Sequence, residues 1–159
     1  MDKGVRDSEC LYGKSLGGIK EVFLEKICDS YESVENFFGS KASSLSPKEI
    51  ELNVYHKGVG FKRHTDKGKA EGDIGSREIT YLYYFYNEPK AFEGGDLVLF
   101  DTNRKTGACG DEFTRIAIKN NMLLFFPSDC WNQVTQLKSE GADFYSGRFT
   151  LNGWMHSKP

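Results

Sequence analysis

From residue 50 onward, the sequence contains a succession of short apolar runs with no helical pattern between them. A doubly wound parallel sheet needs helices between its strands, so the succession excludes that class of fold. Strands at fairly even spacing instead predict an all-β core, a jelly roll or a sandwich of two sheets. The run "REITYLYYFYN" is β-branched and aromatic throughout, which predicts a central strand buried on both faces. The runs lie at 50–56, 77–87, 94–100, 113–118, 122–127, 132–137 and 145–156.

The N-terminal part of the chain follows a different pattern, with apolar residues at helical spacing. We therefore predict one or two helices over residues 16–40, followed by a turn or a helix start at Pro47. A chain of 159 residues suits one domain with one core. The sequence thus predicts a single, mostly β domain over 1–159, in which helices at about 16–40 pack on one sheet of a core at about 50–156.

Charge and cysteine usage limit the partners and the compartment that we expect. The formal net charge is −2, so a basic domain that grips phosphate backbones, and with it a nucleic-acid partner, is not expected. No apolar run approaches the ~20 residues that cross a bilayer, and the N-terminus has no apolar signal-peptide region. Widely spaced cysteines without a C-x-x-C pair favour reduced thiols in a cytoplasmic protein. They are Cys10, Cys28, Cys109 and Cys130.

Two pairs of polar residues carry the chemistry that the sequence suggests. His64 and Asp66 in "FKRHTD" are two apart, so on a strand both would offer their side chains to one metal ion. Arg148 and Thr150 in "GRFTLNGW" have the same spacing, and a guanidinium beside a hydroxyl is a good receptor for a carboxylate. Each pair alone also fits a plainer interpretation: an exposed polar loop for the first and a solvated strand face for the second.

The order of motifs along the chain resembles that of the iron(II)- and 2-oxoglutarate-dependent dioxygenases, most closely the prolyl 4-hydroxylase-like branch. The likeness extends from about Glu51 to Trp154. It implies a double-stranded β-helix, a jelly-roll or cupin-like fold, that uses Fe(II), 2-oxoglutarate and O2, with ascorbate as an optional addition. It also implies oxidation of an unactivated C–H bond in a small-molecule or peptide substrate, such as a prolyl or other amino-acid-derived group. The matching motifs are Tyr55, H-x-D, "REITYLYY", "FEGGDLVLF", "LLFFPSD" and "RFTLNGW".

The resemblance also implies roles for individual residues. His64 and Asp66 match two of the three iron ligands, and an imidazole with a carboxylate suits Fe(II). Arg148 matches the basic residue that holds the far carboxylate of 2-oxoglutarate, and Thr150 matches the hydroxyl that assists it. Two tyrosines match further contacts to cosubstrate or substrate, and ordinary packing in an aromatic core is the other interpretation of them. These tyrosines are Tyr55 and Tyr84.

The third iron ligand of the family is a histidine after the "FFPSD" segment, and this sequence has Asn132 there. One explanation is that asparagine replaces the histidine and weakens or abolishes metal binding, because an amide oxygen is a weaker ligand for Fe(II) than imidazole nitrogen. A second is that Asn132 or water completes a working site. A third is that another residue, such as Cys130 two positions earlier, supplies the ligand. We do not expect His56 or His156 to reach the metal.

These alternatives leave three classes of function open. The first is an oxygenase in which His64, Asp66 and Arg148 are the catalytic residues. The second is a metal-impaired or inactive member of the same fold that binds 2-oxoglutarate or a similar dicarboxylate at Arg148. The third is a metal-free, cupin-like lectin or scaffold in which the H-x-D spacing is a coincidence.

Overall fold

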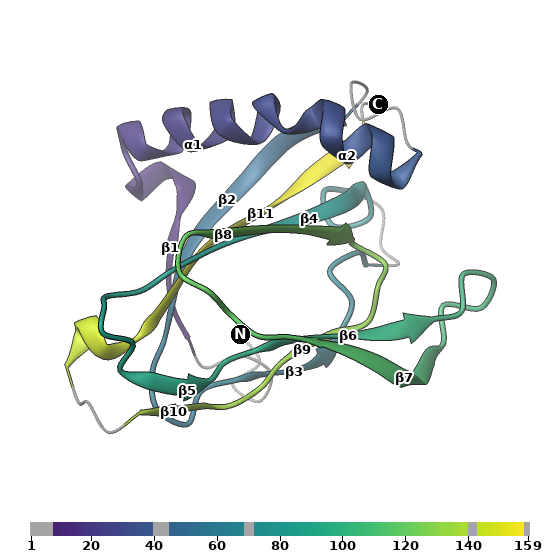
Figure 1. The fold of residues 1–159 in the computed structure, drawn as a ribbon. Helices are drawn as coiled ribbons and strands as arrows, with labels where there is room; N and C mark the ends of the chain where they lie inside the picture. The colour runs from purple at the N-terminus through teal and green to yellow at the C-terminus, as the bar shows by residue number, and fades with distance from the viewer. Residues whose placement is uncertain (1–7, 40–44, 69–71, 140–142, 158–159) are drawn as a thin grey trace.

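Two β-sheets face each other, and two α-helices pack outside the larger sheet (Figure 1). The computed structural model describes residues 8–39, 45–68, 72–139 and 143–157. Its elements are β1 (Glu9–Tyr12), the 3-10 helix η1 (Gly13–Ser15), α1 (Gly18–Asp29), α2 (Tyr31–Phe38), β2 (Leu45–Tyr55), β3 (Phe61–His64), β4 (Arg77–Phe85), β5 (Phe92–Gly94), β6 (Leu97–Thr102), β7 (Cys109–Ile116), β8 (Met122–Pro127), β9 (Asn132–Val134), β10 (Leu137–Ser139), the 3-10 helix η3 (Phe144–Ser146) and β11 (Arg148–Ser157). The larger sheet has the order β1-β2-β11-β4-β8, the smaller β3-β9-β6-β7, and β5 pairs with β10.

The mostly β prediction is confirmed, and it is most accurate where a run is apolar throughout. The predicted run 122–127 coincides with β8, and the run 77–87 forms β4, between β11 and β8 in the larger sheet. Successive side chains of β4 point to opposite faces of the sheet. Tyr81 packs toward the helices, whereas Tyr84 faces the smaller sheet and packs against Leu97. The central strand is therefore buried on both faces, as predicted.

The predicted helical segment 16–40 contains α1 and α2, which cover the outer face of the larger sheet (Figure 1). Ile27 of α1 is fully buried there, in one cluster with Tyr81 of β4. The prediction of a turn or helix start at Pro47 is wrong, because Pro47 lies inside β2. Among the described residues β1 pairs with Glu51–Val54 only, so one edge of β2 is open at the proline. An open edge tolerates a residue that lacks a backbone N–H.

Several other boundaries differ from the sequence expectation, among them those of β6 and β7, which were expected at 94–100 and 113–118. The run 132–137 is divided between β9 and β10, because β9 pairs with β3 and β6 whereas β10 pairs with β5. The chain thus changes its partner strand within one predicted strand. The run 145–156 begins in η3, and its strand starts only at Arg148. The short strand β1 was not predicted, since its four residues carry no clear alternation.

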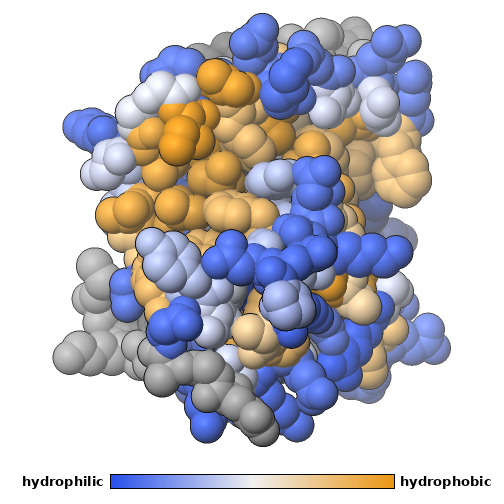
Figure 2. Space-filling view, turned by 60° about the vertical axis from the view of Figure 1, so that its left-hand side comes forward, coloured by the Kyte–Doolittle hydropathy of each residue, from blue (hydrophilic) through white to orange (hydrophobic). Residues whose placement is uncertain are grey.

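Apolar side chains form a broad area on one face of the molecule (Figure 2). Exposed apolar residues of β1 and α1 include Leu11, Ile19 and Val22. The helices lie on the outer side of the larger sheet, away from the space between the sheets (Figure 1). Within the described segments, no helix is long and apolar enough to span a membrane. All four cysteines are free thiols.

Gly153 in β11 is a position where even a methyl group does not fit. A Cβ atom there would clash with the carbonyl oxygen of Glu49 in β2 and with the hydroxyl group of Tyr81. We predict that Gly153→Ala lowers the free energy of unfolding by about 3 kcal/mol, because β2 cannot withdraw without losing its pairing with β11. Thermal unfolding checks this against Gly18→Ala, where the added methyl group meets open space. Equal losses of stability in the two variants would contradict the prediction.

Candidate active site

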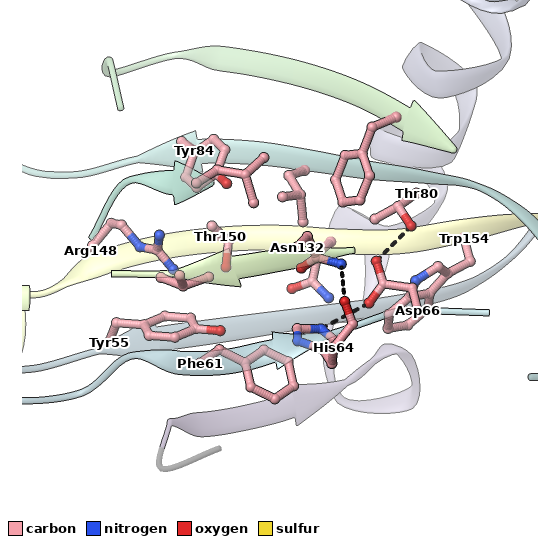
Figure 3. Close-up of a pocket in the computed structure, with 15 residues that line it drawn as sticks. Tyr55, Phe61, His64, Asp66, Thr80, Tyr84, Asn132, Arg148, Thr150 and Trp154 are labelled. Atoms are coloured by element: carbon pink, nitrogen blue, oxygen red, sulfur yellow. Dashed lines mark hydrogen bonds and ion pairs between the residues drawn. The ribbon is translucent and has the colours of Figure 1, made fainter. Parts of the chain in front are cut away.

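All of the predicted site residues line one pocket between the two sheets (Figure 3). Cross-strand pairing explains part of this arrangement, because Arg148 lies opposite Tyr55 and Thr150 lies opposite Tyr84. Directly opposed residues of neighbouring strands point to the same face of a sheet. The larger sheet supplies Tyr55, Tyr84, Arg148 and Thr150, the smaller sheet supplies His64 and Asn132, and the loop after β3 supplies Asp66.

His64 and Asp66 meet at one end of the pocket, with His64 Nε2 and Asp66 Oδ1 3.2 Å apart (Figure 3). The pair comes together as the sequence predicts, but strand alternation is not the reason. β3 ends at His64, and Asp66 lies two residues beyond it in the following loop. A loop residue has no sheet register to fix its side chain, so other contacts must hold Asp66 in place.

Three side chains or carbonyl groups of neighbouring segments hold Asp66. Its backbone N–H donates to the carbonyl of Ser128 at 3.0 Å, and its own carbonyl accepts from Arg77 Nη1 at 3.2 Å. Its carboxylate oxygen Oδ2 accepts from the hydroxyl of Thr80 at 2.7 Å. These three residues, Ser128, Arg77 and Thr80, were not predicted as site residues from the sequence. The available signal was Thr80, a hydroxyl within an apolar strand, because a buried hydroxyl needs a partner.

The hydrogen bond of His64 Nδ1 leaves Nε2, which faces Asp66, as the ring nitrogen available to a cation. Nδ1 lies 2.7 Å from the carbonyl oxygen of Lys62, which accepts only, so Nδ1 carries the ring proton. When the ring is neutral, Nε2 therefore keeps its lone pair and presents it toward the carboxylate of Asp66. In that form the imidazole nitrogen and the carboxylate oxygen can both bind one metal ion. His64 and Asp66 therefore fit two positions of an Fe(II) site.

Asn132 lies beside this pair, directly opposite His64 in the pairing of β9 with β3. Its Nδ2 atom donates to the carbonyl oxygens of His64 and Cys130, at 3.4 Å each. Because both acceptors are carbonyl groups, the side-chain nitrogen must point at them, and Oδ1 is the only atom of the amide left for a cation. The described residues contain no group of three His, Cys, Asp or Glu that could hold a metal.

Cys130 is poorly placed to supply the third ligand. Its Sγ donates to the carbonyl of Phe100 at 3.4 Å, and the thiol packs with the apolar cluster around Tyr84 and Leu97 rather than lining the pocket. Burial also raises the pKa of the Cys130 thiol. A thiol binds metal as the thiolate, so a raised pKa disfavours this role. The geometry thus favours the two explanations that involve Asn132 itself.

Arg148 lies at the other end of the pocket, with only 1% of its surface exposed. Its guanidinium carbon is 4.0 Å from the centre of the Tyr55 ring, and its Nη1 donates to the carbonyl of Gly95. No carboxylate of the described residues forms an ion pair with it, and its Nε is buried without a hydrogen-bond partner in that part of the chain. A buried, unpaired guanidinium is costly, which makes this end of the pocket a fitting receptor for a ligand carboxylate.

The hydroxyl of Tyr84 faces the same end of the pocket. It is fully buried and has no hydrogen-bond partner among the described residues. The guanidinium carbon of Arg148 is 5.2 Å from the Tyr84 ring, and Thr150 lies opposite Tyr84 across the strands. A tyrosine that served packing alone would have its hydroxyl paired, so the orphaned hydroxyl favours contact with a ligand.

The remaining histidines point elsewhere, as expected. His56 packs its ring near Phe144, and His156 is buried with its Nδ1 2.8 Å from the hydroxyl of Ser76. Neither histidine lines the pocket. Trp154 does line it, although the sequence analysis did not assign it a site role. The guanidinium carbon of Arg77 lies 3.6 Å from the centre of the Trp154 ring. Trp154 thus forms part of the pocket wall at the Asp66 end (Figure 3).

Comparison with known proteins gives one family. Residues 50–156 match the model of the 2OG-Fe(II) oxygenase superfamily. A Synechocystis sp. protein that bears the name uncharacterized PKHD-type hydroxylase is 32% identical over 155 residues, which cover 96% of this chain and 50% of that protein. The chain therefore spans half the length of this curated relative.

Solved structures share the fold at low sequence identity. A prolyl-4-hydroxylase of Pseudomonas putida aligns with a TM-score of 0.68 and 16% identity, over 98% of this chain and 74% of that one. A prolyl hydroxylase of Trichoplax adhaerens, solved with a peptide fragment of the hypoxia inducible factor oxygen degradation domain, aligns with a TM-score of 0.62 and 19% identity, over 96% and 64% of the two chains. These likenesses confirm the predicted jelly-roll fold.

We expect Tyr84 to make the stability of the folded protein depend on pH in the alkaline range. Burial raises the pKa of its phenol above the ordinary value of 10.0, and the positive charge of Arg148 opposes this only in part. Above pH 10 the unfolded chain releases a proton that the folded protein keeps, so the free energy of unfolding falls as the pH rises. We predict a smaller fall in Tyr84→Phe, measured by urea unfolding from about pH 9 to about pH 11. An identical pH dependence in variant and wild type would disprove this.

Proposed function

The chain belongs to the 2OG-Fe(II) oxygenase superfamily, and from this premise we propose that it is an Fe(II)- and 2-oxoglutarate-dependent oxygenase that hydroxylates an unactivated C–H bond. One observation carries the proposal. A single pocket has His64 Nε2 facing Asp66 Oδ1 at one end and the unpaired, buried guanidinium of Arg148 at the other. A metal chelated by one end of 2-oxoglutarate, with the far carboxylate on an arginine, needs two such ends in one cavity.

In this proposal each residue has a separate task. His64 and Asp66 hold the iron, and Arg148 with Thr150 orients the far carboxylate of 2-oxoglutarate. The bound iron supplies the oxidation of C–H to C–OH by O2, while 2-oxoglutarate is converted to succinate and CO2. The protein contributes orientation and the exclusion of water. Phe126 and Leu82 line the pocket, so part of its wall is apolar.

Asn132 sets how well this chemistry operates in this chain. Its amide nitrogen donates to two backbone carbonyl groups. Only the neutral amide oxygen, or a water molecule, is therefore left to act as the third ligand beside His64 and Asp66. An amide oxygen binds Fe(II) more weakly than imidazole does, and we therefore propose weak metal binding that depends on the chelating cosubstrate. The second candidate function is a dicarboxylate-binding protein without turnover. The unpaired Arg148 supports it as strongly as it supports the oxygenase.

The proposed substrate class and compartment rest on less specific observations than the proposed chemistry. The name of the Synechocystis relative, a PKHD-type hydroxylase, supports hydroxylation, and we propose a peptidyl prolyl or other amino-acid-derived substrate. The net charge of −2 gives no electrostatic basis for a nucleic-acid partner. The four free thiols support a cytoplasmic location. Membership in the superfamily disfavours the lectin or scaffold alternative, in which the H-x-D spacing was a coincidence.

Restoring the histidine separates the two candidate functions. We predict that Asn132→His raises the affinity for Fe(II) by roughly tenfold to a hundredfold, because an imidazole nitrogen replaces an amide oxygen. The measurement is an anaerobic titration with Fe(II) and 2-oxoglutarate, following the weak visible charge-transfer band of the chelate, with succinate assayed after O2 is admitted.

If the wild-type chain produces succinate, it is a working oxygenase. If only Asn132→His produces succinate, the wild-type chain is an impaired oxygenase. If the chelate band is absent from both proteins, the oxygenase proposal is contradicted. Turnover that persists in His64→Ala or Asp66→Ala would contradict the proposed metal ligands.

A further inference from the structure

We propose that Thr80, supported by Ser128, is a positioning residue that aims one oxygen of the Asp66 carboxylate at the metal. The proposal rests on the function proposed above and concerns residues that carry no role in it so far. Thr80 lies on the inner face of β4, with 1% of its surface exposed, and Ser128 follows β8 with none exposed. Neither residue binds the metal in this account. They act through Asp66.

The hydroxyl of Thr80 donates a hydrogen bond to one of the two carboxylate oxygens of Asp66. Thr80 Oγ1 donates to Asp66 Oδ2 at 2.7 Å, while Asp66 Oδ1 faces His64 Nε2 at 3.2 Å (Figure 3). A carboxylate on a loop can rotate about its terminal bond, which has broad, roughly two-fold preferences. The charge-assisted bond from Thr80 removes that freedom. It leaves Oδ1, the oxygen beside His64, as the one directed at a cation.

Proton counting gives the hydrogen bonds a single direction. Each hydroxyl has one proton, and the Thr80 proton goes to the carboxylate, which accepts only. The 3.0 Å contact between Thr80 Oγ1 and Ser128 Oγ must therefore have Ser128 as its donor. The chain runs from Ser128 to Thr80 to Asp66, and each donation strengthens the next one in a buried setting. Both hydroxyls have a partner, so the arrangement is complete without water.

Ser128 also fixes the main chain on which the carboxylate stands. Its carbonyl accepts from the N–H groups of Asp66 at 3.0 Å and Lys67 at 2.8 Å, and its own N–H donates to the carbonyl of Glu78 at 2.9 Å. One residue after β8 therefore holds both the backbone and, through Thr80, the side chain of Asp66. This double hold replaces the strand register that Asp66 lacks.

The backbone role of β4 is separable from the hydroxyl of Thr80. Thr80 pairs with Trp154 of β11 and Phe126 of β8 through the main chain, which a substitution of the side chain leaves in place. Valine keeps the β-branched shape and loses the hydroxyl, whereas serine keeps the hydroxyl and loses a methyl group. A packing role predicts that valine is the milder change. The positioning role predicts the opposite order for metal affinity.

The test measures the affinity for Mn(II) in the presence of 2-oxoglutarate by its free-ion paramagnetic resonance signal, in the wild-type chain and in the Asn132→His background. We expect Thr80→Val to weaken Mn(II) binding about tenfold, as the loss of an outer-shell partner does in metal sites. Thr80→Ser should stay near the parent value, and Ser128→Ala should fall between them. The matched control is Thr114→Val, an exposed threonine on β7, which should change nothing.

The outcomes distinguish failure of the positioning role of Thr80 from failure of the oxygenase proposal. Parent-like Mn(II) affinity in Thr80→Val, or an equal loss in Thr80→Ser, overturns the positioning role and leaves the oxygenase proposal standing. No Mn(II) binding in either parent protein overturns the oxygenase proposal, and the positioning role with it. Thermal unfolding of each variant identifies one that does not fold. In that case Ser128→Ala decides, because parent-like Mn(II) affinity in it overturns the relay from Ser128 to Asp66.

Discussion

The hydrogen bonds that hold Asp66 against the larger sheet are the constraint on which the pocket depends. Asp66 follows β3 of the smaller sheet, whereas Thr80 lies in β4 and Ser128 follows β8, both strands of the larger sheet. The contacts therefore join the two sheets at the end of the pocket where His64 and Asp66 face each other. They also supply the conformational order that a loop would otherwise lack, and ordering a residue costs roughly 1–2 kcal/mol of backbone entropy.

A second contact joins the sheets at the opposite end of the pocket. Arg148 of β11 donates from Nη1 to the carbonyl of Gly95, in the turn before β6. Gly95 has a φ of 68°, and a Cβ atom there would lie 3.3 Å from Arg148 Cδ. Glycine thus allows both the turn and the close approach of the arginine. The rest of the guanidinium lacks a counter-charge among the described residues, and a dicarboxylate would provide it.

How much of this could be predicted from the sequence depends on the range of the interactions. Alternation within one strand correctly placed Arg148 and Thr150 on one face, because that period is local. The same rule gave the right pair but the wrong reason for His64 and Asp66, since β3 ends before Asp66. The hold from Ser128 joins residues 62 positions apart, and no local pattern encodes it.

The family resemblance supplied what periodicity could not. It predicted that Asn132 occupies the position of the family's third iron ligand, and the structure places that residue directly opposite His64. The pairing of β9 with β3 connects segments 68 residues apart, so spacing along the chain does not reveal it. Pro47 shows the reverse case, a residue whose local preference for a turn is overridden by an open sheet edge.

The most direct test of the account is a crystal structure of the protein grown without O2 in the presence of Mn(II) and 2-oxoglutarate. Anomalous scattering would locate the metal, and the electron density would locate both carboxylates of the cosubstrate. We predict Mn(II) between His64 and Asp66 Oδ1, with the Thr80 hydroxyl still donating to Oδ2 and the far carboxylate of 2-oxoglutarate bound to Arg148. A metal bound elsewhere, or a dicarboxylate that leaves Arg148 unpaired, would contradict it.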